Sequence, residues 1–354
     1  MLETFPFAGY HFAYKNMSEN KNSGAETPVL SPQKLAGIIN SSLERAFPLL
    51  ISLGVILGVV LPWVFIDMRS IVPFLFGTVT LVGALKLRVR ELGKTIASPL
   101  PILLYFLTAR VFMPLIVFAF SSLVFNNPDI VAGYVLLYAV PTAVTGFIWV
   151  SLYKGDPALG LTLILLDTIF APIVVPATVR LLLGGGINLD MTGMIVSLTL
   201  MIVIPTIAGV ALNESSRGKI PALLTPYLAP LSKLLMILVV AANASAVAPQ
   251  IRFDNPQMWL IIAASVIFIV LSFFCARFAA TAGKLNREKE VAFLFASSLR
   301  NSASAMTLAI RYFPEIAALP AVLGIMLQHN TAAVMGRIFY GKIGGSQAKG
   351  QQAK

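Results

Sequence analysis

The sequence predicts an all-α, polytopic membrane protein with about ten transmembrane helices, and three observations favour this fold class. The first is composition, because the 354 residues are 57% hydrophobic and 12% charged, with a mean hydropathy of +0.85. Soluble proteins carry about 25% charged residues, so this composition argues against a soluble enzyme. The second is length, because the chain contains apolar runs long enough for helices of about 20 residues across a bilayer. The third is periodicity, since no run shows the two-residue alternation of a transmembrane β-strand.

The apolar runs are joined by short loops and flanked by two polar tails. We expect residues 1–34 to form a disordered cytoplasmic tail and residues 344–354 to form a second polar tail. The first tail has no apolar run long enough for a signal peptide, and it contains acidic residues but no arginine. The predicted spans are 47–66, 71–87, 100–124, 130–153, 156–183, 191–213, 229–248, 258–283, 289–313 and 317–340.

The distribution of basic residues predicts the orientation of the chain. One side of the membrane would carry 18 Lys and Arg residues, and the other side would carry four, which are Arg69, Arg180, Arg252 and Arg311. In membrane proteins the cytoplasmic loops carry the excess of Lys and Arg. We therefore expect a cell-membrane protein with both termini in the cytoplasm. This topology also accounts for the formal net charge of +11 without nucleic acid as a partner.

A weak internal similarity divides the spans into two halves. Residues 153–159 join the fourth span to the fifth, and residues 312–319 join the ninth to the tenth in a similar way. Halves of five spans have opposite orientations, and inverted repeats of this kind are typical of secondary transporters. We therefore predict a first five-helix repeat over residues 35–187 and a second over residues 188–343.

Polar residues near the middle of the spans are the candidate functional residues. A charged side chain at this depth costs at least about 2.5 kcal/mol, so each one is a functional hypothesis. Arg110, Asp167 and Arg300 lie near the middle of the third, fifth and ninth spans, whereas the first, second and sixth spans have no charge there. A polar-centred bundle beside an apolar one is the layout expected of an alternating-access carrier. Asp167 is either the structural ion-pair partner of Arg110 or Arg300, or a group that balances charge or carries a proton.

The fourth and ninth spans are predicted to be interrupted helices. Pro141, Gly146 and small residues break the fourth span, and the small polar stretch 296–305 breaks the ninth. Such breaks bring backbone groups and half-helix dipole ends to the midplane, where Arg300 favours an anion. The expected substrate-binding residues are Thr142, Thr145, Arg300, Asn301, Ser302 and His329, with Asp167 and Arg110 in coupling or charge balance.

At these residues the chain resembles the bile acid:sodium symporter superfamily, which includes relatives for keto acids, pantothenate and arsenite. The resemblance rests on residues 112–115, 141–159 and 299–308. It implies ten helices in two inverted five-helix repeats. It also implies a panel of spans 1, 2, 6 and 7 and a core of the other six, with spans 4 and 9 crossing at their breaks.

The chain departs from this family at the positions that the resemblance implies for sodium. The symporters place Ser-Asn where this chain has Gly146 and Phe147, and hydroxyl groups where it has Gly160 and Ile164. They place a Glu where this chain has Ala296, followed by a Gln where it has Arg300. A hard cation needs several oxygen ligands, and these are largely missing. Sodium coupling is therefore not expected, and protons carried by Asp167 or His329 are the alternative. The arsenite branch has a Cys directly after the Pro, where Thr142 stands, so the soft ligand for arsenite is missing too.

These observations predict a secondary transporter of a small organic anion rather than an enzyme, with the lipid bilayer as its surroundings and without a cofactor. The alternative is an intramembrane enzyme or a non-transporting membrane receptor. An enzyme lacks support, because the single cysteine and two histidines exclude cysteine-rich and histidine-based metal sites. A receptor would need a soluble sensor domain, and the tails are too short for one. His329 is alternatively a helix-packing residue. The sequence does not indicate an oligomeric state.

Overall fold

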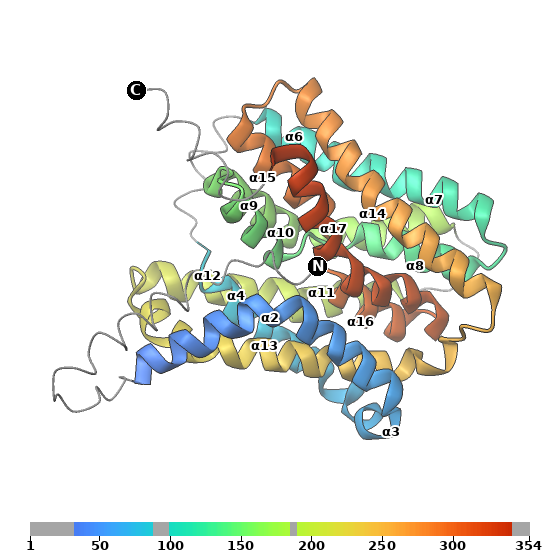
Figure 1. Ribbon diagram of the computed structural model, residues 1–354, viewed down its shortest axis with the longest axis horizontal. Helices are drawn as coiled ribbons and strands as arrows, with labels where there is room; N and C mark the ends of the chain where they lie inside the picture. The colour runs from blue at the N-terminus through green and yellow to red at the C-terminus, as the bar shows by residue number, and fades with distance from the viewer. Residues whose placement is uncertain (1–31, 88–98, 185–189, 342–354) are drawn as a thin grey trace, which may run out of the picture.

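The computed structural model describes residues 32–87, 99–184 and 190–341, and the regular elements within these ranges are helices (Figure 1). The expected C-terminal tail, and the expected N-terminal tail up to residue 31, lie outside the described residues. Two apolar helical stretches within the described residues, Leu49–Val60 and Pro128–Ala139, are shorter than a full span. In the part of the chain that the structure describes, seven helical runs are long and apolar enough to cross a membrane: Pro62–Ala84, Leu100–Val124, Pro157–Leu183, Met191–Ser215, Lys219–Gln250, Pro256–Ala282 and Glu315–Tyr340.

A first group of helices, which we call the panel group, forms one layer of the molecule (Figure 1, lower part). Within it α2 packs along α13, and α4 packs against both α12 and α13. Two glycines of α2 allow this close approach, because a Cβ atom on Gly58 would lie 2.2 Å from the carbonyl oxygen of Ala241. The panel group comprises α2 (Pro32–Val60), α3 (Pro62–Phe65), η2 (Ile66–Ile71), α4 (Val72–Ala84), α11 (Met191–Leu198), η6 (Thr199–Val203), α12 (Ile204–Ser215), α13 (Lys219–Val247) and η7 (Ala248–Gln250).

The remaining helices, which we call the core group, lie over the panel group (Figure 1). In this group α14 packs against α15 and α17, and α8 packs against α7 and α10. The core group comprises α6 (Leu100–Phe106), η4 (Leu107–Phe112), α7 (Met113–Val124), α8 (Pro128–Ala139), η5 (Val144–Gly146), α9 (Phe147–Leu152), α10 (Pro157–Leu183), α14 (Pro256–Ala282), α15 (Arg287–Ser298), α16 (Ser302–Tyr312), η8 (Glu315–Ala318) and α17 (Leu319–Tyr340).

Two of the predicted spans have wrong boundaries. The expected span 47–66 begins at Pro32 instead and ends at Val60, because Pro62 cannot continue the hydrogen-bonding pattern of α2 and starts a new helix. The expected span 229–248 begins ten residues earlier, at Lys219, although Pro226 and Pro230 lie inside the helix. In both cases the helix continues into a more polar stretch that hydropathy alone does not assign to it.

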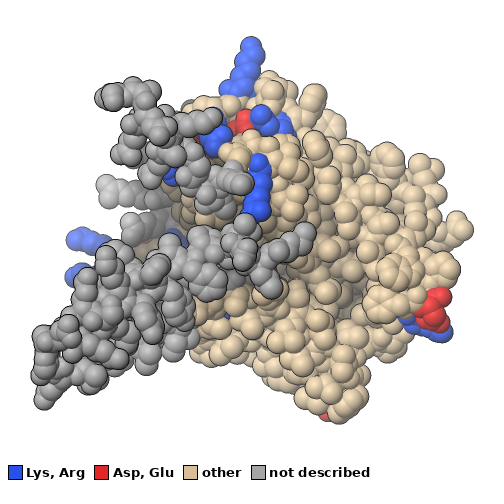
Figure 2. Space-filling model, in the orientation of Figure 1, with Lys and Arg blue, Asp and Glu red and all other residues tan. Residues whose placement is uncertain are grey.

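The surface has the character of a membrane protein. Large apolar side chains are exposed on many helices, among them Phe74, Leu123 and Phe278, which are each 77% or more exposed. Figure 2 shows a broad face without charge, with Lys and Arg side chains gathered at one end over α6, α9 and α15. An uncharged belt between charged ends is the surface expected of a protein surrounded by lipid.

Candidate functional site

The candidate site lies where two interrupted helices meet. Helix α8 ends at Ala139 and α15 ends at Ser298, and the chain is extended after each. Thr142 and Arg300 face each other as an isolated antiparallel bridge, flanked by two backbone hydrogen bonds. The N–H of Ala143 donates to the carbonyl of Leu299 over 3.0 Å, and the N–H of Asn301 donates to Pro141 over 2.8 Å. The two breaks therefore satisfy part of each other's backbone hydrogen bonding, as the membrane interior requires.

The central residue of each break donates its backbone N–H to a side chain of another helix. The N–H of Thr142 donates to Oδ2 of Asp167 on α10 over 2.7 Å. The N–H of Arg300 donates to Oε1 of Gln328 on α17 over 2.6 Å. Because both acceptors are buried, each interrupted helix is fixed to one continuous helix.

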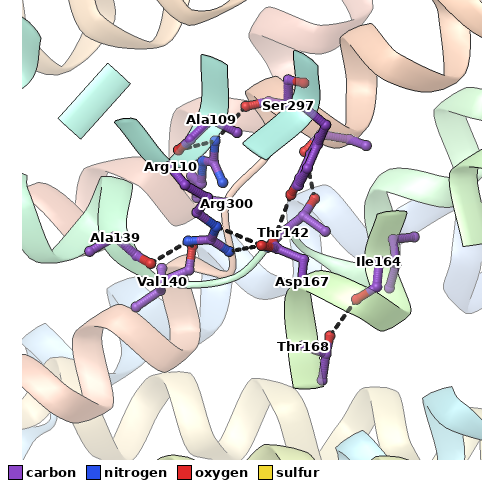
Figure 3. A network of polar contacts seen from close by, with 12 residues as sticks. Ala109, Arg110, Ala139, Val140, Thr142, Ile164, Asp167, Thr168, Ser297 and Arg300 are labelled. Atoms are coloured by element: carbon purple, nitrogen blue, oxygen red, sulfur yellow. Dashed lines mark hydrogen bonds and ion pairs between the residues drawn. The ribbon is translucent and has the colours of Figure 1, made fainter. Parts of the chain in front are cut away.

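Asp167 forms its ion pair with Arg110, so the structure settles which of the two arginines is its partner. Oδ2 of Asp167 also accepts from the hydroxyl of Tyr105 over 2.7 Å. Arg110 donates in addition to the carbonyls of Ala139 and Val140, which are the last carbonyls of α8 (Figure 3). Arg110 therefore places its positive charge at the negative end of the α8 dipole.

Arg300 occupies the equivalent place at the end of α15. Its Nη2 donates to the carbonyl of Ser297 over 2.7 Å and to that of Ala109 over 3.1 Å (Figure 3). Its Nε and Nη1 atoms are buried and have no hydrogen-bond partner among the described residues, although the residue is only 3% exposed. The hydroxyl groups of Ser297 and Ser298, the last two residues of α15 before the break, are also buried without a partner in the described part of the chain. The break at α15 and α16 thus contains several unused hydrogen-bonding groups, which are costly in an apolar interior.

The side chains of the other predicted residues at the crossing form hydrogen bonds with the two breaks or with α17. The Thr142 hydroxyl lies within hydrogen-bond distance of the carbonyls of Ala296, at 2.8 Å, and Leu299, at 2.9 Å. The side chain of Asn301 accepts from the N–H of Ser304 over 3.1 Å and so caps α16. The hydroxyl of Ser302 accepts from the amide of Gln328.

Thr145 and His329 form a separate cluster between η5 and α17. The indole N–H of Trp149 donates to Nδ1 of His329 over 3.1 Å, and Nε2 of His329 lies 3.4 Å from the Thr145 hydroxyl. An indole can only donate, so Nδ1 must accept, and His329 is the neutral tautomer with its proton on Nε2. The aromatic rings of Trp149 and Phe295 stack beside it, at a centroid distance of 6.0 Å. These contacts favour a role for His329 in helix packing over a role as a proton carrier.

Sequence reasoning missed Tyr105 and Trp149, and it did not include Gln328, Ser297 and Ser298 among the expected binding residues. Tyr105 lies five residues before Arg110, a spacing that does not share one face of an α-helix. The intervening segment η4 is π-helical, and its wider turn brings residues five apart onto the same side. The Pro114 that follows was the visible signal of an irregular helix, but it does not specify a π-helix.

Comparison with known proteins assigns the chain to a family. Residues 72–252, about half of the chain, match the sequence profile of the Sodium Bile acid symporter family. The uncharacterized protein YbaS of Bacillus subtilis (strain 168) is 33% identical over 82% of this chain and 95% of its own length. The chain belongs to the Sodium Bile acid symporter family. It is therefore a multi-pass membrane protein of a transporter family.

Two further relatives carry transporter names. The uncharacterized sodium-dependent transporter YocS of Bacillus subtilis (strain 168) is 21% identical over 84% of this chain and 91% of its own length. The probable sodium/metabolite cotransporter BASS1, chloroplastic, of Arabidopsis thaliana is 26% identical over 59% of this chain and 53% of its own length. These names favour a transporter over an enzyme or a receptor.

Proposed function

We propose that this protein is a secondary transporter that moves a small organic anion across the cell membrane by alternating access. The observation that carries the proposal is Arg300, whose guanidinium is buried at the crossing with Nε and Nη1 unpartnered. A guanidinium remains charged, and its free N–H groups form strong hydrogen bonds with a carboxylate. Arg300 is therefore the primary contact for the anion.

The other predicted residues have supporting roles in this proposal. Thr142, Asn301 and Ser302 hold the two breaks in shape around Arg300, as their hydrogen bonds indicate. Thr145 and His329 form the neighbouring wall of the binding region and provide neutral polar groups. Asp167 and Arg110 balance charge rather than carry a proton, because the oxygens of Asp167 already accept from Arg110, Tyr105 and Thr142.

We propose a topology of ten spans in two inverted repeats, residues 35–187 and 188–343, with both termini in the cytoplasm. Two corresponding contacts support the repeat. Thr142 binds Asp167 through its backbone in the first half, and Arg300 binds Gln328 through its backbone in the second half. Both pairs join an interrupted helix to the long helix that follows it, as inverted repeats would.

The transport cycle that we propose does not use sodium, in contrast to the names of YocS and BASS1. A sodium ion at a helix break would need the carbonyl oxygens exposed there. At the end of α8 these carbonyls accept from Arg110, and at the end of α15 the Ser297 carbonyl accepts from Arg300. The guanidinium groups of Arg110 and Arg300 therefore occupy carbonyl oxygens that a coupling cation would need as ligands, and their positive charges repel such a cation.

The test is anion binding to Arg300 variants. We expect Arg300→Gln to weaken binding of the anionic ligand at least tenfold, or about 1.4 kcal/mol, because it removes the charge from the contact. Arg300→Lys keeps the charge and should lose less. The assay is a thermal-shift titration of purified protein against organic acids, with the melting temperature of each variant without ligand as the folding control. Unchanged affinity in a folded Arg300→Gln variant would make Arg300 a structural residue.

A further inference from the structure

The charges buried in the protein do not cancel. Among the charged side chains that the structure describes, only Arg110, Asp167 and Arg300 are buried, at 7%, 1% and 3% exposure. All three lie at the crossing of the two breaks (Figure 3). Two arginines and one aspartate leave one positive charge in the interior of the protein.

The single negative charge is already committed to Arg110. Asp167 is ion-paired with Arg110, and its Oδ2 atom accepts from Tyr105 and from the N–H of Thr142. Among the described residues, the guanidinium of Arg300 donates only to the two neutral carbonyls of Ala109 and Ser297. The uncompensated charge is therefore that of Arg300, whose Nε and Nη1 atoms have no hydrogen-bond partner within the described ranges.

An uncompensated charge in a medium of low dielectric constant strongly favours a ligand that cancels it. We propose that the substrate is a monovalent organic anion, which neutralises Arg300 so that the occupied interior has no net charge. This inference rests on the proposed function and specifies the class of anion. A divalent anion would replace one buried positive charge by one buried negative charge, with no second cation to meet it.

The neighbouring hydroxyl groups fit the same ligand. Ser297 and Ser298 are buried in the same break and have hydroxyl groups without a partner in the described part of the chain. A hydroxyl can donate to a carboxylate oxygen, and doing so adds no charge. One carboxylate can use donors from Arg300 and from a serine, whereas a second carboxylate on the same ligand finds no additional positive charge.

The experiment compares acids that share a carbon skeleton and differ by one carboxylate. Purified protein is titrated at pH 7.5 with choline salts of acetate and malonate, propionate and succinate, butyrate and glutarate, and benzoate and phthalate, and the thermal shift is recorded. We expect at least one monocarboxylate to bind at least tenfold more tightly than its dicarboxylate partner. Tighter binding of the dicarboxylates would overturn the inference and leave an anion carrier in place. Absence of binding by every acid would overturn both the inference and the proposed function.

A substitution at Gln328, which changes the net buried charge and leaves Arg300 in place, provides the second measurement. Gln328 accepts from the N–H of Arg300 and is 5% exposed, so Gln328→Glu adds one negative charge beside Arg300 at nearly constant shape. Gln328→Met is the neutral control variant, which loses all hydrogen bonds of the Gln328 side chain, whereas Gln328→Glu keeps an oxygen that can accept from the N–H of Arg300. We expect Gln328→Glu to weaken monocarboxylate binding at least tenfold more than Gln328→Met. Equal binding by the two variants would contradict charge neutralisation as the basis of recognition.

Discussion

The buried ion pair of Arg110 and Asp167 fixes the end of α8 to the middle of α10. Removing one partner of a buried pair leaves the other charge uncompensated. We therefore expect Asp167→Asn to lower the free energy of unfolding by about 3–5 kcal/mol, because Arg110 would then lose its counter-charge in a buried site. The measurement is thermal or denaturant unfolding of the purified protein in detergent.

The chain offers a matched control for this prediction. Arg252 and Asp254 form an ion pair whose side chains are both 67% exposed, so Asp254→Asn should leave the stability unchanged. Replacing Arg110 and Asp167 together by Met and Leu should recover part of the loss, since no unpaired charge remains between them. An Asp167→Asn variant as stable as Asp254→Asn would show that Asp167 is not the structural partner of Arg110.

At the residue scale, the sequence indicates which charged side chains lie in the interior, but it does not indicate which of them are in contact. Arg110, Asp167 and Arg300 were identified from their depth in apolar runs, because charge at that depth is rare. The choice of Arg110 over Arg300 as partner of Asp167 depends on how each helix is rotated, which hydropathy does not report. The neutral state of His329 depends on Trp149, a contact between helices that are distant in sequence.

Helix interruptions were the most predictable elements. Pro141 and Gly146 break the fourth span, and the small polar residues of the stretch 296–305 break the ninth, as expected. The start of α2 and of α13 was not predictable, because both helices extend beyond their apolar runs and are stabilised by packing along each other. Packing partners can extend a helix where the local sequence is polar.

Three polar contacts join the panel group to the core group, and the first is the ion pair of Arg69 on η2 with Glu315 on η8, at an N–O distance of 3.8 Å. Asn243 on α13 donates to the hydroxyl of Thr307 on α16 over 2.7 Å. Ser197 on α11 bonds to the hydroxyl of Tyr312 over 2.6 Å. In the proposed topology these contacts lie on the side opposite to the cytoplasm, and we interpret them as the closed outer gate of an inward-facing state.

This interpretation predicts that a cross-link across the gate stops transport. Asn243→Cys and Thr307→Cys are introduced together after Cys275, the single native cysteine, is replaced by alanine. Because alternating access requires the two groups to separate there, oxidation should abolish exchange of the anion and a reductant should restore it. Each single-cysteine variant is the control for oxidation itself. Full exchange by the cross-linked protein would show that these helices do not separate during transport.

For the whole molecule, our account predicts that the form without net buried charge changes its conformation most easily. The empty interior carries one positive charge, and moving one charge through the membrane potential involves about 2.3 kcal/mol per 100 mV. The occupied interior is neutral in our account and does not have this cost. We therefore expect exchange of anion for anion to be faster than net movement of anion in one direction.

The central claim is that Arg300 supplies the positive charge that a coupling cation would otherwise supply. The most direct measurement is exchange of the monocarboxylate that binds best, radiolabelled, into proteoliposomes preloaded with the same unlabelled anion. Choline is the sole cation in one set and sodium in the other, liposomes without protein measure passive permeation, and proteoliposomes with Arg300→Gln are the variant control. Our account predicts that exchange in choline is within twofold of exchange in sodium, and that both exceed the Arg300→Gln control at least tenfold. Exchange that occurs only with sodium would contradict the account.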